Sequence, residues 1–262
     1  MKLAIYYVVA LVLLQFSLMA QTAVKTSFEA PTYITGNVNS QNLWAVASGN
    51  ASISNAKSKT GSSALSFNNS NSALAVNFIP YSGTVTGIRD IFYTDMWINP
   101  VAFATKGIYL TAYDQYGGSL KRIYIVEFTV DNKIKVSNGG TQVEVGTWTT
   151  NQWTRISIRT DLTAEKFKIA INGVLNVADF SMREAYVPTA SAGRAATYKE
   201  FHSFRINHTT DTQLASSDFT IDDLYIGKNP IPVAKTIGAI KTAIDFEIIG
   251  FPTKKTIEIT KI

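Results

Sequence analysis

Short β-strands follow one another from residue 24 to residue 226, and this succession constrains the fold more than any other feature of the sequence. Each run has four to nine residues, is rich in β-branched and aromatic side chains, and is bounded by turn residues such as Asn172-Gly173. We find no amphipathic helix of ten residues among them, so the sequence predicts an all-β protein. The clearest runs are Val24–Glu29, Ala64–Phe67, Ala73–Ile79, Ile91–Ile98, Gly107–Tyr113, Arg122–Val130, Trp153–Arg159, Lys166–Asn172, Phe201–Asn207 and Phe219–Ile226.

Many of these runs alternate between apolar and polar side chains. In the run 153–159, for example, Thr154, Ile156 and Ile158 lie opposite Arg155 and Arg159. Such alternation is typical of antiparallel sheets that bury one face and expose the other. Ten or more short strands of this kind without helices predict a two-sheet antiparallel jelly-roll sandwich.

The first 20 residues have the pattern of a cleaved secretory signal peptide. Lys2 precedes the apolar run Leu3–Leu14, and small residues up to Ala20 offer a cleavage site. The alternative is a membrane anchor, but about 12–16 apolar residues fall short of the roughly 20 that span a bilayer. No other segment reaches that length. We therefore expect a protein without a membrane span that is secreted to the extracellular space, the periplasm or the cell surface.

Composition excludes several kinds of chemistry. The chain has no Cys, which excludes disulfides, a thiolate nucleophile and a Cys zinc site, and two His residues cannot form a three-His metal site. A net charge of +5, spread along the chain, does not indicate a nucleic-acid partner.

The domain organisation follows from where the strand pattern ends. We predict a jelly-roll domain over residues 21–228, with the irregular insertion Asp179–Glu200 as a loop over one rim. Asn229-Pro230-Ile231-Pro232 looks like a linker, and the rest of the 229–262 tail predicts a β-hairpin over Ile244–Ile249 and Thr256–Ile262. About 30 residues are too few for an independent core.

Several short motifs appear in a familiar order along the chain. They are Ser27-Phe28-Glu29, Asn42-Leu43-Trp44, Ser58-Lys59-Thr60-Gly61-Ser62-Ser63-Ala64-Leu65, Gly146-Thr147-Trp148-Thr149, Gln152-Trp153-Thr154-Arg155, Phe167-Lys168-Ile169-Ala170-Ile171-Asn172-Gly173 and Phe219-Thr220-Ile221-Asp222-Asp223-Leu224-Tyr225-Ile226. Over about residues 26–227 the chain resembles the concanavalin A-like lectin/glucanase jelly rolls of laminin-G type. It is also similar to jelly-roll carbohydrate-binding modules. The resemblance implies a secreted, lectin-like protein that binds a polysaccharide or another glycan.

A structural calcium ion is the cofactor that this resemblance implies. Glu29 opens the domain, and Asp222 and Asp223 close it, so neighbouring terminal strands would bring like charges together. Like charges are unfavourable unless a cation lies between them, and carboxylate oxygens suit Ca²⁺. The alternative is that the three carboxylates face solvent or pair with Lys.

Catalytic motifs are weak in this sequence. Glycoside hydrolysis needs two carboxylates across a cleft, but the Glu-x-Asp-x-Glu spacing of the glucanases is absent and Glu127 is the one acid in its strand. The Arg-Glu and Gln-Ile-His strings of polysaccharide lyases on this fold are also missing. His202 and His208 alternate with core or turn residues, so we do not expect either to be catalytic. These missing motifs favour a non-catalytic protein, and a polysaccharide-degrading hydrolase or lyase is the alternative.

Sugar binding needs flat aromatic faces and a few fixed polar groups. We expect the ligand site near one strand end, with Trp148 in an exposed Thr-rich turn and the other three Trp residues in the core. The predicted ligand-binding residues are Tyr113, Gln115, Tyr116, Arg122, Tyr124 and Trp148. A third possibility is an adhesion or structural module that binds a cell-surface protein, for which an exposed apolar patch would be the sign.

Overall fold

The structure is a computed structural model that describes residues 23–81, 87–116, 119–182, 200–208, 215–230, 232–234, 243–248 and 255–258. For residues 115–116, 119–121 and those after 231, it describes the backbone alone. The predicted signal peptide (1–20) and most of the predicted insertion Asp179–Glu200 lie outside the described residues. Among the residues that are described, no helix is long and apolar enough to cross a membrane.

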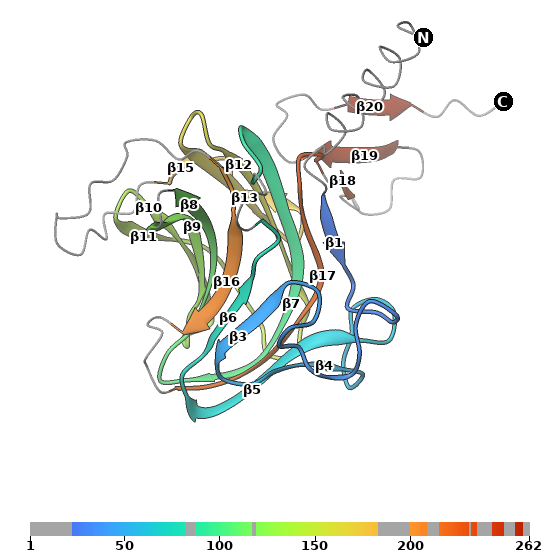
Figure 1. The fold of residues 1–262 in the computed structure, drawn as a ribbon. Helices are drawn as coiled ribbons and strands as arrows, with labels where there is room; N and C mark the ends of the chain where they lie inside the picture. Colours follow the sequence, from blue (N-terminus) through green and yellow to red (C-terminus); the bar gives the residue numbers. More distant parts are fainter. Residues whose placement is uncertain are drawn as a thin grey trace, which may run out of the picture.

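Two antiparallel sheets form the body of the protein and lie against each other as two layers (Figure 1). The ten-stranded sheet contains β1 (Val24–Thr26), β2 (Gly36–Asn37), β4 (Ala51–Ser54), β5 (Ala64–Ser72), β7 (Ile91–Ala104), β12 (Thr154–Asp161), β13 (Lys166–Ile171), β14 (Val174–Leu175), β15 (Phe180–Ser181) and β17 (Ala215–Gly227). The seven-stranded sheet contains β3 (Trp44–Ser48), β6 (Ala75–Phe78), β8 (Ile108–Tyr116), β9 (Ser119–Phe128), β10 (Lys133–Asn138), β11 (Thr141–Thr147) and β16 (Ser203–His208).

The strand order defines a jelly roll. The ten-stranded sheet runs β14-β13-β12-β7-β17-β5-β4-β2, and the seven-stranded sheet runs β11-β10-β9-β8-β16-β6-β3. The chain therefore crosses from sheet to sheet between β5 and β6, β6 and β7, and β7 and β8. The late strands β16 and β17 then insert between strands formed much earlier in the chain. This arrangement confirms the predicted all-β, two-sheet antiparallel sandwich.

Aromatic rings from the two sheets meet in the core between them. The ring of Tyr124 on β9 lies 5.7 Å from that of Phe167 on β13, and the ring of Phe92 on β7 lies 4.9 Å from that of Phe201 beside β16. All four side chains are buried. Burying a large apolar side chain contributes roughly 1.5–3 kcal/mol, so such contacts hold the two layers together without disulfides.

Two of the three Trp residues predicted to be core residues lie outside the core. Trp44 is buried as expected, and its ring packs 4.9 Å from that of Phe78. Trp97, in contrast, is half-buried on the outer face of the ten-stranded sheet, because Met96 and Ile98 on either side of it point into the core. Trp153, just before β12, is also only half-buried, so the predictions for Trp97 and Trp153 were wrong.

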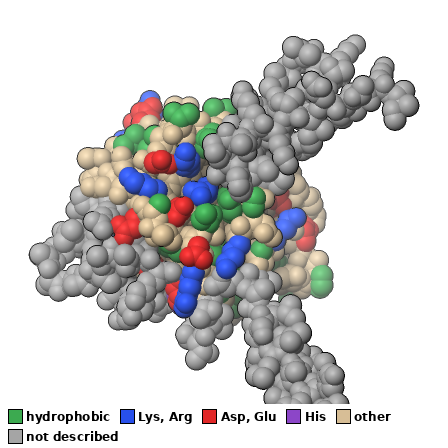
Figure 2. All heavy atoms as spheres, turned by 90° about the horizontal axis from the view of Figure 1, so that it is seen from above, with side chains coloured by type: hydrophobic (Ala, Val, Ile, Leu, Met, Phe, Trp, Pro, Cys, Tyr) green, Lys and Arg blue, Asp and Glu red, His purple; other side chains and the backbone are tan. Residues whose placement is uncertain are grey.

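Charged side chains of both signs are mixed on the surface. Figure 2, which looks down on the molecule of Figure 1, shows Lys and Arg side chains beside Asp and Glu side chains across one face. Exposed ion pairs such as Lys133–Glu144 (2.9 Å) contribute to this mixture. Such pairs contribute little to stability, at most about 1 kcal/mol each.

The C-terminal strands form a third sheet of their own. It has the order β18 (Pro232–Ala234), β19 (Ala243–Ile248) and β20 (Lys255–Glu258), and its neighbours are antiparallel. The pairing of β19 with β20 corresponds to the predicted hairpin, with both strands beginning one residue earlier than expected.

Candidate functional site

Two of the predicted ligand-binding residues lie side by side on the seven-stranded sheet. Tyr113 on β8 is the cross-strand partner of Arg122 on β9 and of Ser203 on β16. Tyr113 is only 5% exposed, whereas Arg122 is half-buried. The backbones of Gln115 and Tyr116 continue β8 beyond this pair, and their side chains lie outside the described part of the structure.

Tyr124 and Trp148 are core residues, so the prediction that they contact ligand was wrong. Tyr124 is buried, and its hydroxyl donates a hydrogen bond to Thr94 Oγ1 (2.8 Å). Trp148 is 5% exposed; its indole N–H donates to the carbonyl oxygen of Thr129 (3.0 Å), and its ring packs edge-on against Phe103. Each polar group has a partner inside the protein, which leaves neither side chain available to a sugar.

The face of the seven-stranded sheet that points away from the core carries a polar and aromatic grid. On β8, β9 and β16, the core takes one set of alternating residues, so the other set lies on this outer face. Cross-strand register arranges the outer residues in rows. One row contains Asn77, Arg205, Thr111, Ile125, Ser137 and Gln142; the next contains Asn207, Tyr109, Glu127, Lys135 and Glu144; and the third contains Ser203, Tyr113 and Arg122.

Three side chains from different strands meet on this outer face. Gln142 Nε2 on β11 donates a hydrogen bond to the hydroxyl of Tyr109 on β8 (3.4 Å), and the Gln142 side chain also hydrogen-bonds the carboxylate of Glu127 on β9. Since β8 and β11 are three strands apart, about 14 Å at ordinary strand spacing, these side chains lean toward each other across the sheet. We call Tyr109, Glu127 and Gln142 the outer-face cluster.

Glu127 is the titratable member of the outer-face cluster. Burial raises the pKa of its carboxyl above the ordinary value, and the hydrogen bond from Gln142 and the charge of Lys135 oppose that shift. Lys135 is its direct cross-strand neighbour on β10. A half-buried carboxylate beside a phenol, an amide and an ammonium group offers acceptors and donors at fixed positions, as recognition of sugar hydroxyls requires.

The outer-face cluster was not predicted from the sequence. Glu127 was identified there only as the one acid in its strand, and neither Tyr109 nor Gln142 was a predicted site residue. The signal was present in the alternation for two of them, because Tyr109 lies between the core residues Ile108 and Leu110, and Glu127 lies between Val126 and Phe128. The local sequence does not show that β8, β9, β10 and β11 are paired, and this pairing brings the three side chains together.

Glu29, predicted as a metal ligand, holds a loop through hydrogen bonds. Its Oε1 accepts the backbone N–H groups of Ser62 (2.9 Å) and Ser63 (2.8 Å), and its Oε2 accepts the hydroxyl of Ser62 (2.8 Å). The bond from the Ser63 amide is the main reason that the pKa of Glu29 is lowered. The loop held in this way is residues 57–63, between β4 and β5, and we call it the clamped loop.

Asp222 and Asp223 hold the same loop from β17. Asp222 is buried; its Oδ2 accepts the N–H groups of Lys59 (2.7 Å) and Thr60 (3.1 Å), and its Oδ1 accepts the N–H of Asp223. Burial raises the pKa of Asp222 to about 6, although three N–H donors oppose the shift. Asp223 Oδ1 accepts the hydroxyl of Thr60 (2.8 Å).

The predicted calcium site can be compared with these contacts. Glu29 binds one end of the clamped loop and Asp222 the other, and each oxygen discussed above faces an N–H or O–H donor. Within the described ranges, no group of three or more His, Asp or Glu side chains is arranged to hold a metal ion. The hydrogen bonds account for these carboxylates without a cation, and calcium itself stays a prediction.

The two histidines have structural partners. His208 is fully buried on β16, with its Nε2 3.1 Å from Ser217 Oγ. His202 is 6% exposed; its Nδ1 lies 2.7 Å from the carbonyl oxygen of Tyr81, and its Nε2 lies 3.1 Å from Glu200. Neither belongs to the outer-face cluster.

Comparison with known proteins gives the fold and nothing finer. No family model and no curated protein matches the sequence. Among solved structures, a sialidase matches with a TM-score of 0.55 and 10% identity, covering 80% of this chain and 19% of the sialidase. The globular domain of T. cruzi calreticulin has a TM-score of 0.49 at 11% identity over 75% of this chain and 88% of that domain. Trypanosoma rangeli sialidase has a TM-score of 0.48 at 12% identity, covering 74% of this chain and 30% of the sialidase.

The sialidase match, with the TM-score above 0.5, agrees with the β-sandwich that the strand order defines. This chain spans about a fifth of that protein and shares one residue in ten with it, so the likeness concerns the fold alone.

Proposed function

We propose that this is a non-catalytic, lectin-like protein that binds a polysaccharide or another glycan on the outer face of the seven-stranded sheet. The observation that carries the proposal is the outer-face cluster, in which Tyr109, Glu127 and Gln142 from three strands converge. A phenol can pack on the C–H face of a pyranose ring, and the amide and carboxylate can bond its hydroxyls.

The remaining rows of the grid extend this surface. Arg205 lies in the centre of the sheet between Asn77 and Thr111, and the predicted pair Tyr113 and Arg122 lies in the third row. A ligand that follows the rows would meet the half-buried amide of Asn77 and the guanidinium groups of Arg205 and Arg122, whereas Tyr113, at 5% exposed, offers it no ring face. Such an extended polar surface suits a polymer better than a single small sugar.

The stability of the protein gives a second argument. Burial disfavours the charged form of Glu127, so this carboxylate at neutral pH costs free energy of folding. Residues that reduce stability are often kept because function needs them. A sugar hydroxyl that donates to Glu127 would satisfy the carboxylate where burial has removed water.

Affinity electrophoresis of the full chain, in gels that contain a panel of soluble polysaccharides, tests the proposal. We expect at least one neutral polymer to retard the protein and Gln142→Ala to weaken that retardation about tenfold, which corresponds to about 1.4 kcal/mol. Lys166→Ala is the matched control, because Lys166 is exposed on β13 of the other sheet. Equal retardation of Gln142→Ala and the unchanged protein would reject the site.

The same gels separate the alternative functions. A polymer that becomes shorter during incubation would indicate a hydrolase or lyase and contradict the non-catalytic assignment. Absence of retardation by every polymer would favour an adhesion or structural module with a cell-surface protein as partner. Secretion belongs to the same proposal, and N-terminal sequencing of the exported protein tests it: cleavage after Ala20 is the expected result.

A further inference from the structure

A second polar and aromatic surface lies on the ten-stranded sheet, on the side of the sandwich opposite the outer-face cluster. Asp95, Trp97 and Asn99 alternate along β7 with the core residues Met96 and Ile98, so all three lie on the outer face. Successive residues on one face of a strand are about 7 Å apart. Trp97 is therefore the centre of a linear array on this face.

The clamped loop places two cations over this array. Lys59 Nζ lies 4.1 Å from the centre of the Trp97 ring. Lys57 Nζ donates hydrogen bonds to Asn99 Oδ1 (3.1 Å) and Asn151 Oδ1 (3.0 Å). Because the ammonium of Lys57 is held by two neutral amide oxygens, these bonds orient the cation without neutralising its charge.

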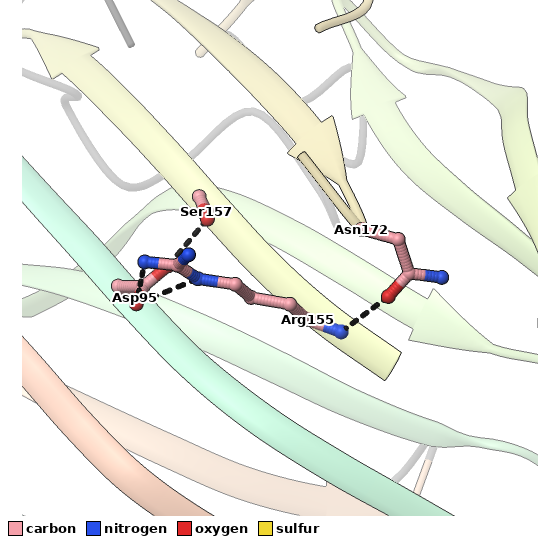
Figure 3. Close-up of polar contacts among 4 residues, drawn as sticks. All are labelled: Asp95, Arg155, Ser157 and Asn172. Carbon is pink, nitrogen blue, oxygen red and sulfur yellow. Dashed lines mark hydrogen bonds and ion pairs between the residues drawn. The ribbon is translucent and has the colours of Figure 1, made fainter. Parts of the chain in front are cut away.

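Arg155 lies beside Trp97 on the neighbouring strand. It is the cross-strand partner of Trp97 on β12, with its guanidinium carbon 5.9 Å from the ring centre. Figure 3 shows the guanidinium extending along the sheet to Asp95, which it binds through two nitrogens at 2.9–3.1 Å, while Ser157 donates to the same carboxylate. The backbone N–H of Arg155 donates to Asn172 Oδ1 (2.8 Å).

These contacts decide the charge of the surface. The carboxylate of Asp95 is occupied by Arg155 and Ser157, and that of Asp222 by backbone amides of the clamped loop. The contacts of Lys57 and Lys59 described above are with amide oxygens and with an indole ring. Asp222, the cross-strand neighbour of Trp97 on β17, keeps its own charge, because backbone amides are neutral. The positive charge that the surface offers a ligand is therefore that of the two ammonium groups beside Trp97 and Asn99.

We propose that this surface is a second binding site, which takes an acidic saccharide. The C–H face of the sugar packs on the accessible part of the Trp97 ring, and its carboxylate or sulfate pairs with Lys57 and Lys59. A cation that rests on an indole ring without a carboxylate partner can turn toward an anion at little cost. The site is independent of the outer-face cluster, because the two lie on different sheets.

Titration of the full chain with trigalacturonate, followed by tryptophan fluorescence at low and high salt, tests the proposal. Trp44 and Trp148 are buried, whereas Trp97 and Trp153 are half-buried, so the titration is repeated with Trp97→Phe, in which the change caused by a ligand that displaces Lys59 should be absent. We expect saturable binding that weakens with salt, and an affinity about tenfold lower in the double variant Lys57→Gln, Lys59→Gln. Gln retains an N–H donor for Asn99 and Asn151, which preserves the loop contacts.

Controls keep this proposal separate from the first. Gln142→Ala should bind trigalacturonate as the unchanged protein does, and neutral galactotriose should not change the fluorescence. A heparin-derived hexasaccharide in a second titration distinguishes sulfate from carboxylate as the preferred anion. Equal affinity of the double variant and the unchanged protein, or no binding of either acidic oligosaccharide, would overturn the second site and leave the glycan-binding proposal for the other sheet unaffected.

Discussion

Glu29 and Asp222 hold one loop from its two ends: Glu29 accepts the amides of Ser62 and Ser63, and Asp222 accepts those of Lys59 and Thr60. The two carboxylates are 193 residues apart in sequence, and neither depends on the other for its hydrogen bonds. Together they fix the clamped loop, which in turn positions Lys57 and Lys59 on the ten-stranded sheet.

Glu29→Ala should destabilise the protein by about 1–2 kcal/mol, because three charge-assisted hydrogen bonds are lost and two backbone amides lose their acceptor. Glu29→Gln should cost less, since the amide oxygen can still accept. Urea unfolding monitored by fluorescence measures both. Similar unfolding midpoints for Glu29→Ala and the unchanged protein would mean that water replaces the carboxylate without loss.

Glu29 and Asp222 should change the stability of the protein with pH in opposite directions. The pKa of Glu29 is lowered, so its contribution is present above the ordinary value of 4.5 and is lost as pH falls through its folded pKa. The pKa of Asp222 is raised from 3.8 to about 6, so its contribution is complete below 3.8 and is lost as pH rises through about 6. Between pH 3.8 and 4.5 both titrations affect stability, and above that interval only the titration of Asp222 does.

Comparison with Asp222→Asn isolates the pH-dependent contribution of Asp222 to stability. The variant lacks the titrating group, so its stability relative to the unchanged protein should rise between about pH 4 and 7, by no more than about 3 kcal/mol. A constant offset is also expected, because the Asn carbonyl oxygen can accept the N–H groups of Lys59 and Thr60 but the NH2 group then faces the N–H of Asp223. Unfolding free energies at several pH values give the difference, and a difference that does not vary with pH would contradict a raised pKa.

The sequence was sufficient to predict the two sheets but not the positions of several side chains. Alternation predicted the strands around Ile156 and Ile169 and the two-sheet packing, because core burial has the period of the strand. In the structure the same alternation puts Asp95 and Trp97 on one outer face, between residues that point into the core. The expectation that Trp97 is buried came from the resemblance and was wrong.

Arg122 shows what strand periodicity alone does not predict. Tyr124 alternates with the core residues Val126 and Phe128, and unbroken alternation would turn Arg122 inward as well. A β-bulge between β8 and β9 leaves Ile123 without a direct partner, since Ala112 pairs with Tyr124 and Tyr113 pairs with Arg122. The extra residue places Arg122 on the outer face. Trp148 is similar, because its indole N–H reaches the carbonyl oxygen of Thr129, 19 residues earlier, a contact that no local turn motif indicates.

Tyr124→Phe should destabilise the protein by about 1–2 kcal/mol, because it leaves the buried hydroxyl of Thr94 without its donor. Thr94→Val in the same protein should recover part of that loss, since both polar groups are then absent. A double-mutant cycle measured by thermal unfolding gives the coupling. Additive effects would indicate that the hydrogen bond contributes nothing beyond the individual side chains.

Chelation tests the predicted calcium ion separately. The amide and hydroxyl donors already satisfy Glu29 and Asp222, so we expect the same Tm in EDTA and in excess calcium. An ion bound by Glu29 would instead make EDTA lower the Tm of the unchanged protein and leave Glu29→Ala unaffected. That outcome would establish the cation that the resemblance implies.

Glu127→Gln should raise the Tm at pH 7.5 and leave it nearly unchanged at pH 4. Burial raises the pKa of Glu127, so the charged form is the less stable one in the folded protein; its penalty is absent below the ordinary value of 4.5 and appears as pH rises through the folded pKa. Glutamine keeps a carbonyl oxygen for the hydrogen bond from Gln142 and removes the charge. Scanning calorimetry at the two pH values measures the difference.

Glu144→Gln is the control for this prediction, because Glu144 is exposed on the same sheet and pairs with Lys133. Its substitution should not raise the Tm at either pH. If Glu127→Gln stabilises the protein and also weakens polysaccharide retention, the carboxylate is kept for binding at the expense of stability. If it stabilises the protein and binding is unchanged, Glu127 has no part in the glycan site, and that site must be sought around Arg205 and Arg122.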